Sequence, residues 1–475
     1  MYNSPQRTLK QSIDWKLVIC YLVLVLIGWV NIYAASHAAE GTAMLDFSVR
    51  SGKQFVWILS SLGLAALILF VFNPRLWEVI SVPTYLLVLV LLVAVIVLGV
   101  EVKGSRSWFA LGPVRFQPAE ISKIATSLVL AAVMSRPGFK LTKKMDLLKV
   151  AATVGLPMLI ILAESETGSA LVYLGFVFVL YREGLSGWFL VAIGAAVLLF
   201  ILTLTASPYA SVLTLIGMTG LFYYAHTGKL RRWPWMEGLA IVFLAFLPKL
   251  LALFTTLAPM TALAGICILM LLWLAWKALR TRDNALWLTI AAFVVGIALI
   301  FSTDFIFNNV LQDHQRKRIE VLLGLKEDPA GVGYNVNQSM IAIGSGGLFG
   351  KGFLHGTQTA YGFVPEQSTD FIFCTVGEEW GFFGCLVVIL LYIFMISRII
   401  IDAEHCRESY TRIYGYCVAS LIFMHLFINI GMTIGLVPVI GIPLPFLSYG
   451  GSSLWAFTIL LFIFLALYRQ ERKYF

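Results

Sequence analysis

Residues 15–35 read WKLVICYLVLVLIGWVNIYAA, with Lys16 as the only charged side chain. An α-helix needs about 20 predominantly apolar residues to cross the hydrocarbon core of a bilayer. Apolar runs of this length recur along the chain as far as Tyr468. Of the 475 residues, 60% are hydrophobic and 12% are charged. This composition excludes a soluble globular protein and predicts an all-α polytopic membrane protein.

About fourteen transmembrane helices are expected. The first run is too long for the apolar region of a cleavable signal peptide and lacks a convincing cleavage site, so we expect a signal anchor. The expected helices start near Trp15, Gln54, Trp77, Ala119, Leu148, Ser169, Trp188, Tyr209, Trp235, Met260, Leu286, Glu378, Thr411 and Ser452.

The distribution of Lys and Arg predicts the orientation of the chain. With the N-terminus in the cytoplasm, roughly 22 of the 34 basic residues fall on cytoplasmic segments, which fits the positive-inside rule. Both termini are then cytoplasmic. The positive-inside placement of Lys and Arg explains the net charge of +9. We therefore expect no nucleic-acid partner.

Cysteine and histidine usage indicates no metal site of the zinc type. The six cysteines lie mostly within or beside apolar runs and form no C-x-x-C pair, so neither a zinc site nor a disulfide framework is indicated. His314, His355, His405 and His425 are scattered without ligand spacing, and no Ser-His-Asp order is present.

Asp370 ends the polar stretch HGTQTAYGFVPEQSTD, residues 355–370, and an apolar segment begins directly after it. A carboxylate near hydrocarbon is costly, so it usually faces a cavity, a partner or a substrate. The alternative is a helix N-cap, for which Thr369 and Asp370 are suitable residue types. The loop around it, residues 303–375, alternates apolar and polar residues, which favours a folded, re-entrant or interfacial structure.

A second outward segment, residues 103–123, combines charges with the start of a helix. Pro118 suits the first helical turn. Glu120 and Lys123 are three residues apart and share one helix face, so they either pair with each other or line a cavity together with Arg106 and Arg115. Trp108 in the same loop is typical of an interfacial aromatic anchor.

Three shorter outward segments also carry candidate residues. Glu164 and Glu166 flank an outer turn and are either plain loop acids or ligands of a divalent cation. Residues 344–352 are rich in glycine and include Lys351, which suits either a flexible hinge or a phosphate contact. Residues 438–453 contain three prolines, which preclude a continuous helix, and end with the hydroxyls of Ser448 and Tyr449.

These motifs together resemble the SEDS family (shape, elongation, division and sporulation proteins), in its RodA-like branch. The resemblance is carried by segments spread through most of the chain outside residues 207–299: QPAE (117–120), QRKR (315–318), GYNVNQSMIAIGSGG (333–347), HGTQ (355–358), TDFIF (369–373), NIGM (429–432) and PLPFLSYGGSS (443–453).

The resemblance implies a peptidoglycan glycosyltransferase that polymerises lipid II at the outer face of the bacterial cytoplasmic membrane, for cell elongation and shape. It implies a class B penicillin-binding protein as partner, together with undecaprenyl-linked glycan and other membrane proteins of the elongation complex. Two alternatives stay open from the residues alone: a lipid II flippase or transporter, and a non-catalytic activator of a penicillin-binding protein.

The resemblance also assigns candidate site residues. The essential acid of the family falls on Asp370, a second important acid on Glu120, and a functional tryptophan on Trp108. The family usually has Gln-Pro-Asp where this chain has Glu164-Ser165-Glu166. Further candidate substrate-binding residues are Arg106, Lys123, Lys351, Gln358, Glu366, Ser448 and Tyr449.

The family typically has ten spans, so residues 207–299 are expected to form about four added helices between two parts of the family core, 1–206 and 300–475.

For the reaction itself, an attacking sugar hydroxyl needs one general base, and Asp370 is the candidate. The pyrophosphate that leaves needs positive charge, from Lys351, Lys123, Arg106 or a divalent cation such as Mg²⁺ or Mn²⁺.

Overall fold

A computed structural model describes residues 12–40, 43–102, 105–111, 114–227, 243, 246–247, 259–311, 313–323, 325 and 332–473. The chain divides into two compact units. The core unit comprises Met1–Ser186 and Asp328–Phe475, and the middle unit comprises Gly187–Glu327.

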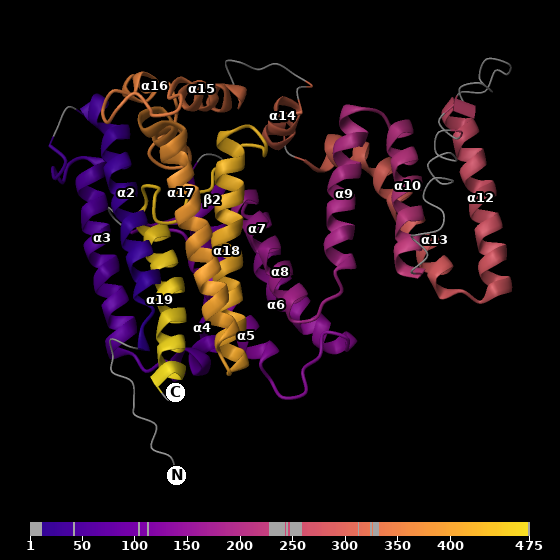
Figure 1. The fold of residues 1–475 in the computed structure, drawn as a ribbon, viewed down its shortest axis with the longest axis horizontal. Coiled ribbons are helices and arrows are strands. Elements are labelled where there is room, and N and C mark those ends of the chain that lie inside the picture. Colours follow the sequence, from indigo (N-terminus) through magenta and orange to yellow (C-terminus); the bar gives the residue numbers. More distant parts are fainter. Residues whose placement is uncertain are drawn as a thin grey trace, which may run out of the picture. The chain divides into compact units, whose positions relative to one another are not determined.

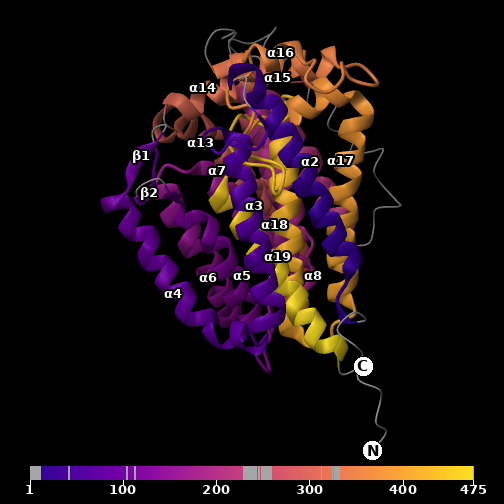
Figure 2. The same ribbon diagram turned by 90° about the vertical axis from the view of Figure 1, so that its left-hand side faces the viewer.

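The described part of the core unit is a bundle of mostly long helices (Figures 1 and 2). The π-helical turn Leu67–Val71 continues α3 (Arg50–Ala66), and the short 3-10 turn Tyr173–Gly175 joins α7 (Thr167–Val172) to α8 (Phe176–Arg182). The helices are α2 (Trp15–Glu40), α3 (Arg50–Ala66), α4 (Arg75–Leu98), α5 (Pro118–Met134), α6 (Lys144–Ala163), α7 (Thr167–Val172), α8 (Phe176–Arg182), α15 (Val332–Ser345), α16 (Thr357–Ala360), α17 (Ile372–Glu404), α18 (Ser409–Thr433) and α19 (Gly451–Lys473).

The middle unit has its own small apolar core, formed by residues such as Leu215, Leu263 and Phe293. Its described helices are α9 (Trp188–Thr205), α10 (Pro208–Thr227), α12 (Pro259–Thr281), α13 (Asn284–Phe305), the π-helical turn η3 (Ile306–Val310) and α14 (Asp313–Leu322). The expected insert boundaries at 207 and 299 stay predictions.

The expectation of a multi-span helical protein is confirmed. Within the described residues, ten helices are long and apolar enough to cross a membrane. The helices α5, α7–α8 and α10 also lie where spans were expected, but they are not among those ten. The span expected from Trp235 lies outside the described residues. The total of fourteen and the orientation of the termini therefore stay predictions.

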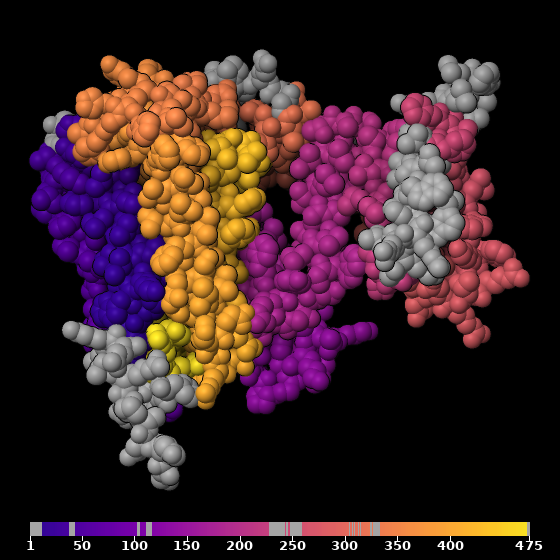
Figure 3. All heavy atoms as spheres, in the orientation of Figure 1, coloured from indigo at the N-terminus to yellow at the C-terminus, as the bar shows by residue number. Residues whose placement is uncertain are grey.

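Burial places α18 at the centre of the core unit. Along the apolar stretch of α18, 83% is buried, whereas along that of α4 only 22% is buried. A helix that is apolar on every side and still buried belongs inside a bundle, and one that is apolar and uncovered suits contact with lipid. The side chains of α17 run along the core unit from one end to the other (Figure 3). The central helix is therefore the natural place to search for buried polar side chains.

The structure adds a small sheet that the all-α prediction missed. Strands β1 (Val100–Val102), β2 (Ser105–Leu111) and β3 (Val114–Phe116) form an antiparallel sheet in the order β1-β2-β3. Trp108 lies opposite Val100, and Phe109 lies opposite Phe116. Strands this short, placed between two apolar helices, have too few alternating positions to produce a clear strand pattern.

Helix α17 is broken at Gly381, whose φ of 67° and ψ of −161° are not helical. Backbone polar groups freed by such a break need new partners, above all in a membrane protein. The glycine-rich segment 344–352 provides them, so it packs on α17 rather than acting as a free hinge. Four hydrogen bonds join the two: Lys351 N to Glu378 O (3.0 Å), Gly352 N to Glu379 O (3.0 Å), Phe382 N to Gly347 O (2.9 Å) and Phe383 N to Leu348 O (3.2 Å).

We predict that Gly381→Ala destabilises the protein by at least ~2 kcal/mol, because a Cβ there would lie 2.3 Å from Gly350 N and the positive φ disfavours any side chain. Thermal unfolding of the purified protein in detergent would measure the loss. Gly155→Ala in α6 is the matched control, because nothing lies within 4 Å of a Cβ at that position. Equal unfolding temperatures for the two variants would contradict the role assigned to the break.

Candidate functional site

Asp370 lies against a stretch of irregular backbone, residues 434–450, between α18 and α19. The side-chain amide of Asn429 in α18 donates to Asp370 O at 2.8 Å and to Ile442 O at 2.7 Å. A Cβ built on Gly441, whose φ is 76°, would lie 3.2 Å from Asp370 Oδ2. The carboxylate therefore points at the backbone around Gly441, and this part of the chain does not continue as a helix, as the prolines predicted.

The N-cap alternative for Asp370 is wrong. Helix α17 begins at Ile372, and its N-cap position is Phe371, which makes no side-chain cap hydrogen bond. The preceding turn is built on Glu366, whose φ is 56° and whose carbonyl accepts from Thr369 N at 3.1 Å. Glu366 Oε2 also accepts from Thr369 Oγ1 at 3.0 Å, so this side chain shapes the turn that presents Asp370.

Ser448 and Tyr449 join the two loops by hydrogen bonds. Ser448 Oγ donates to Thr369 O at 2.6 Å and accepts from Leu444 N at 2.8 Å. Tyr449 N donates to Ser368 O at 2.8 Å. These contacts place Ser448 and Tyr449 beside the Asp370 turn and give the hydroxyl of Ser448 a positioning task.

Glu120 and Lys123 form the predicted i,i+3 pair, buried at 3% and 2% exposure. Lys123 Nζ donates to Glu120 Oε1 at 2.7 Å and also contacts His425 Nε2 at 2.9 Å. The second contact was missed, because His425 was treated as one of several scattered histidines. The available signal was its position four residues before Asn429, which places both polar side chains on one face of a span.

The turn between α6 and α7 carries two further acids, of which Glu164 is buried and Glu166 is half-buried. Glu166 Oε2 accepts from Gln117 Nε2 at 2.6 Å and from Ser169 Oγ at 3.0 Å. Both carboxylate oxygens of Glu164 are buried without a hydrogen-bond partner. Burial, with the nearby Glu166 charge, raises the pKa of Glu164 to about 8. Burial, followed by the charge of Glu120, raises the pKa of Glu166 above its usual value.

No three His, Cys, Asp or Glu side chains converge to hold a metal ion within the residues that the structure describes. Mg²⁺ nevertheless needs only one or two carboxylates when water and substrate phosphates complete its shell. Glu164, with two unpartnered oxygens, and its neighbour Glu166 meet that smaller requirement.

The remaining candidate residues lie on the sheet and on the glycine-rich segment. Arg106 Nε is 3.6 Å from Glu101 Oε2, and both side chains are exposed, so this pair is weak and Arg106 is accessible. Trp108 lies on the same strand, half-buried. The side chain of Arg115 lies outside the described residues.

Lys351 is already paired. Lys351 Nζ lies 2.7 Å from Glu378 Oε1 and donates to Thr357 Oγ1 at 2.7 Å. Glu378 Oε1 also accepts from the backbone N–H of Gln358 at 2.8 Å. Lys351 and Gln358 therefore hold the glycine-rich segment and α16 on α17 in this structure.

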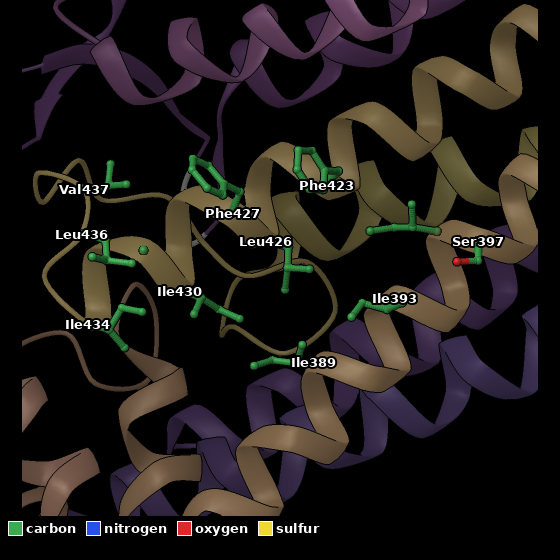
Figure 4. Close-up of a pocket in the computed structure, with 12 residues that line it drawn as sticks. Ile389, Ile393, Ser397, Phe423, Leu426, Phe427, Ile430, Ile434, Leu436 and Val437 are labelled. Atoms are coloured by element: carbon green, nitrogen blue, oxygen red, sulfur yellow. The ribbon is translucent and has the colours of Figure 1, made fainter. Parts of the chain in front are cut away.

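An apolar groove of about 420 Å³ lies between α17 and α18. In Figure 4, Ile389 and Ile393 on α17 face Leu426 and Ile430 on α18. Among the described residues that line it, Ser397 alone has a polar side chain, so this lining suits an apolar chain rather than catalysis.

The candidate site and the start of α2 lie at opposite ends of α17. Asp370 immediately precedes α17, whereas Arg398, near its other end, donates to Asp14 Oδ2 at 3.0 Å, just before α2. Tyr468 and Arg472 of α19 line a pocket with Arg398. The end of the core unit at Asp370 brings together exposed and buried charged side chains and irregular backbone: Arg106, Glu120, Lys123, Glu164 and residues 434–450. Such a set can bind an anionic group and accept a proton.

Comparison with known proteins identifies the family of the chain. The model of the FtsW, RodA and SpoVE family, described as cell cycle proteins, matches residues 14–218 and 213–473. The peptidoglycan glycosyltransferase RodA of Treponema pallidum (strain Nichols) is 31% identical, over 93% of this chain and 94% of the relative. The peptidoglycan glycosyltransferase MrdB of Escherichia coli (strain K12) is 32% identical, over 94% of this chain and 90% of the relative.

Solved structures share the fold of this chain. A chain from a study titled "Structural coordination of polymerization and crosslinking by a peptidoglycan synthase complex" is 27% identical, with a TM-score of 0.60 over 97% of this chain and 98% of that chain. The crystal structure of Thermus thermophilus RodA is 23% identical, with a TM-score of 0.55 over 97% of each chain, and shows a shared fold. The chain belongs to the FtsW/RodA/SpoVE family of cell cycle proteins, the SEDS family that its motifs resemble.

Proposed function

We propose that this protein is a peptidoglycan glycosyltransferase that polymerises lipid II into glycan strands, for cell elongation and shape. Relatives of 31% and 32% identity that carry this activity in their names align with nearly the whole chain. The observation that carries the proposal is the Asp370 turn, which Asn429 and Ser448 hold against irregular backbone at one end of the core unit.

In the proposed reaction, a sugar hydroxyl attacks the anomeric carbon of a second lipid-linked sugar. The new glycosidic bond forms as the bond to the lipid pyrophosphate breaks, and Asp370 accepts the proton of the attacking hydroxyl. Asp370 is half-buried rather than enclosed, and hydrogen bonds fix the backbone on both sides of it. Holding two lipid-linked sugars in register beside it can supply several kcal/mol on its own.

The departing pyrophosphate is already anionic, so it needs positive charge rather than an acid. Arg106 is 60% exposed on β2 and is the cation best placed to meet it first. Lys123 is buried and supplies its positive charge to the pyrophosphate from inside the protein, with Glu120 orienting its ammonium group. Lys351, the third candidate, contacts Glu378 and Thr357 in this structure, just as Lys123 contacts Glu120 and His425.

The partner that we propose is a class B penicillin-binding protein, a transpeptidase that crosslinks the strands. Support comes from the 27% identical chain, whose study describes a synthase complex that coordinates polymerization with crosslinking. Lipid II, undecaprenyl-linked glycan and other elongation-complex membrane proteins are the further proposed partners.

The proposed location is the bacterial cytoplasmic membrane, with both termini in the cytoplasm and the Asp370 end facing outward. Arg398 donates to Asp14 and lines a pocket with Tyr468, so the start of α2 and the end of α19 lie at the same end of the core unit. We predict that alkaline phosphatase fused to the C-terminus stays inactive and that a cytoplasm-active reporter there is active. High phosphatase activity would reverse the proposed orientation.

We predict that Asp370→Asn abolishes polymer while leaving folding and lipid II binding intact, because the amide cannot accept the proton but keeps the shape of the side chain. The full-length protein would be reconstituted with labelled lipid II, with and without the cognate partner, and the products separated on a gel. Glu366→Gln is the comparison variant and should reduce activity less, since the amide oxygen can still accept from Thr369.

Glycan ladders from the Asp370→Asn variant would refute the assignment of the general base. Absence of ladders from the unaltered protein in every condition, with labelled lipid crossing the bilayer, would favour the flippase alternative. Ladders that require the partner and persist in the variant would favour a non-catalytic activator.

We also propose that Glu164 and Glu166 bind Mg²⁺ or Mn²⁺ together with the lipid pyrophosphate. Cation binding requires an ionised Glu164, whose pKa is raised to about 8, so protons compete with the metal below that pH. We predict that the Mg²⁺ concentration for half-maximal polymerisation falls as the pH rises from 6.5 to 8.5. Glu164→Gln should remove most of that pH dependence. An unchanged dependence in this variant would exclude Glu164 as a ligand.

A further inference from the structure

His425 and Asn429 lie four residues apart in α18 and therefore on the same face of the helix. Both side chains are buried, at 1% and 0% exposure. Each one contacts the backbone of residues 434–450: His425 Nδ1 lies 3.1 Å from Pro443 O, and Asn429 Nδ2 lies 2.7 Å from Ile442 O. Two consecutive carbonyls of the irregular segment thus depend on two side chains of one helix.

The contacts of His425 define its protonation state. The ammonium group of Lys123 can only donate, so His425 Nε2, 2.9 Å away, must accept. The proton is then on Nδ1, which donates to Pro443 O. Both ring nitrogens are used only if the imidazole is neutral, because an imidazolium offers no acceptor to Lys123. We therefore assign the neutral tautomer with hydrogen on Nδ1.

The imidazole of His425 is a hydrogen-bond partner of both the Pro443 carbonyl and the Lys123 ammonium group. Pro443 and Pro445 prevent the segment from forming a helix, so the Pro443 carbonyl has no helical donor and would be left unpaired at membrane depth. Lys123 is a buried cation whose contacts are Glu120 Oε1, His425 Nε2 and the face of the Phe457 ring, 5.0 Å away. Removing one partner of a buried charge is far more costly than removing one at the surface.

We propose that His425 is a positioning residue that couples the Glu120–Lys123 pair to the irregular segment beside Asp370. The path runs from Glu120 through Lys123 and the imidazole to Pro443. Ile442, next along the chain, shares the Asn429 amide with Asp370. Glu120 and Asp370, which are far apart in the sequence, are thereby held in a fixed position relative to each other. This inference rests on the proposed function, because the geometry matters through lipid II polymerisation.

A structural role alone would lower stability and the amount of folded protein but would leave the turnover of each folded molecule unchanged. A positioning role lowers kcat of the folded protein with little effect on KM for lipid II. The two roles are separated by one variant that removes the hydrogen bonds and one that restores them. His425→Leu keeps an apolar volume beside Phe457, and His425→Gln supplies both an acceptor for Lys123 and a donor for Pro443 O.

For the full-length protein in lipid vesicles with labelled lipid II, we expect His425→Leu to lower kcat at least tenfold, with KM changed less than threefold. His425→Gln should recover kcat to within about threefold of the unaltered protein. When Lys123→Met is already present, adding His425→Leu should lower kcat less than threefold, because the ammonium group that His425 positions is no longer there. His405→Gln, an exposed histidine at the opposite end of α17, is the matched control and should be unchanged.

A second readout does not depend on activity. In protein labelled with ¹⁵N-histidine, the signals lost in His425→Gln should be those of a neutral ring protonated at Nδ1. An imidazolium, or a ring protonated at Nε2, would overturn the proposal even if the protein does not polymerise lipid II. So would a His425→Leu variant with normal kcat, or a loss of activity that His425→Gln fails to recover. A protein that shows the expected ring but makes no polymer would contradict the proposed function instead.

Discussion

The side-chain amide of Asn429 donates to the carbonyls of Asp370 and Ile442, and the arrangement of the site depends on these two contacts. Irregular backbone in a membrane protein survives only where its polar groups find partners inside the protein. Residues 434–450 contain prolines that rule out a helix, so side chains must replace helical hydrogen bonds. The helix that supplies them is the most buried span among the ten, which gives the donors a rigid base.

The same constraint explains the break in α17. Its freed groups pair with the glycine-rich segment, and the side chain of Glu378 accepts from Lys351 and from backbone N–H groups of α16. The glycine-rich segment and α16 are thereby fixed to the helix that follows Asp370. Charged groups in the core unit are consequently of two kinds. Some, such as Lys351, hold backbone in place, whereas others, such as Arg106, are accessible to an anionic ligand.

Much of the fold followed from the sequence because apolar runs and prolines act locally. Run length gave the helices, Pro118 marked the start of α5, and the prolines from Pro438 to Pro445 predicted irregular backbone. The pairing of Glu120 with Lys123 was also local. The contact of Lys123 with His425 spans 302 positions, and no local pattern encodes it. The sheet at residues 100–116 and the break at Gly381 were missed because each depends on a few residues and their tertiary partners.

The most direct test of the central claim is a structure of the Asp370→Asn variant with two lipid-linked sugars bound, determined by electron cryomicroscopy. The account predicts that the attacking hydroxyl lies within hydrogen-bond distance of the side chain at position 370 and in line with the anomeric carbon of the second sugar. An attacking hydroxyl bound beside Glu166, with position 370 out of reach, would contradict the assignment of Asp370 as the general base.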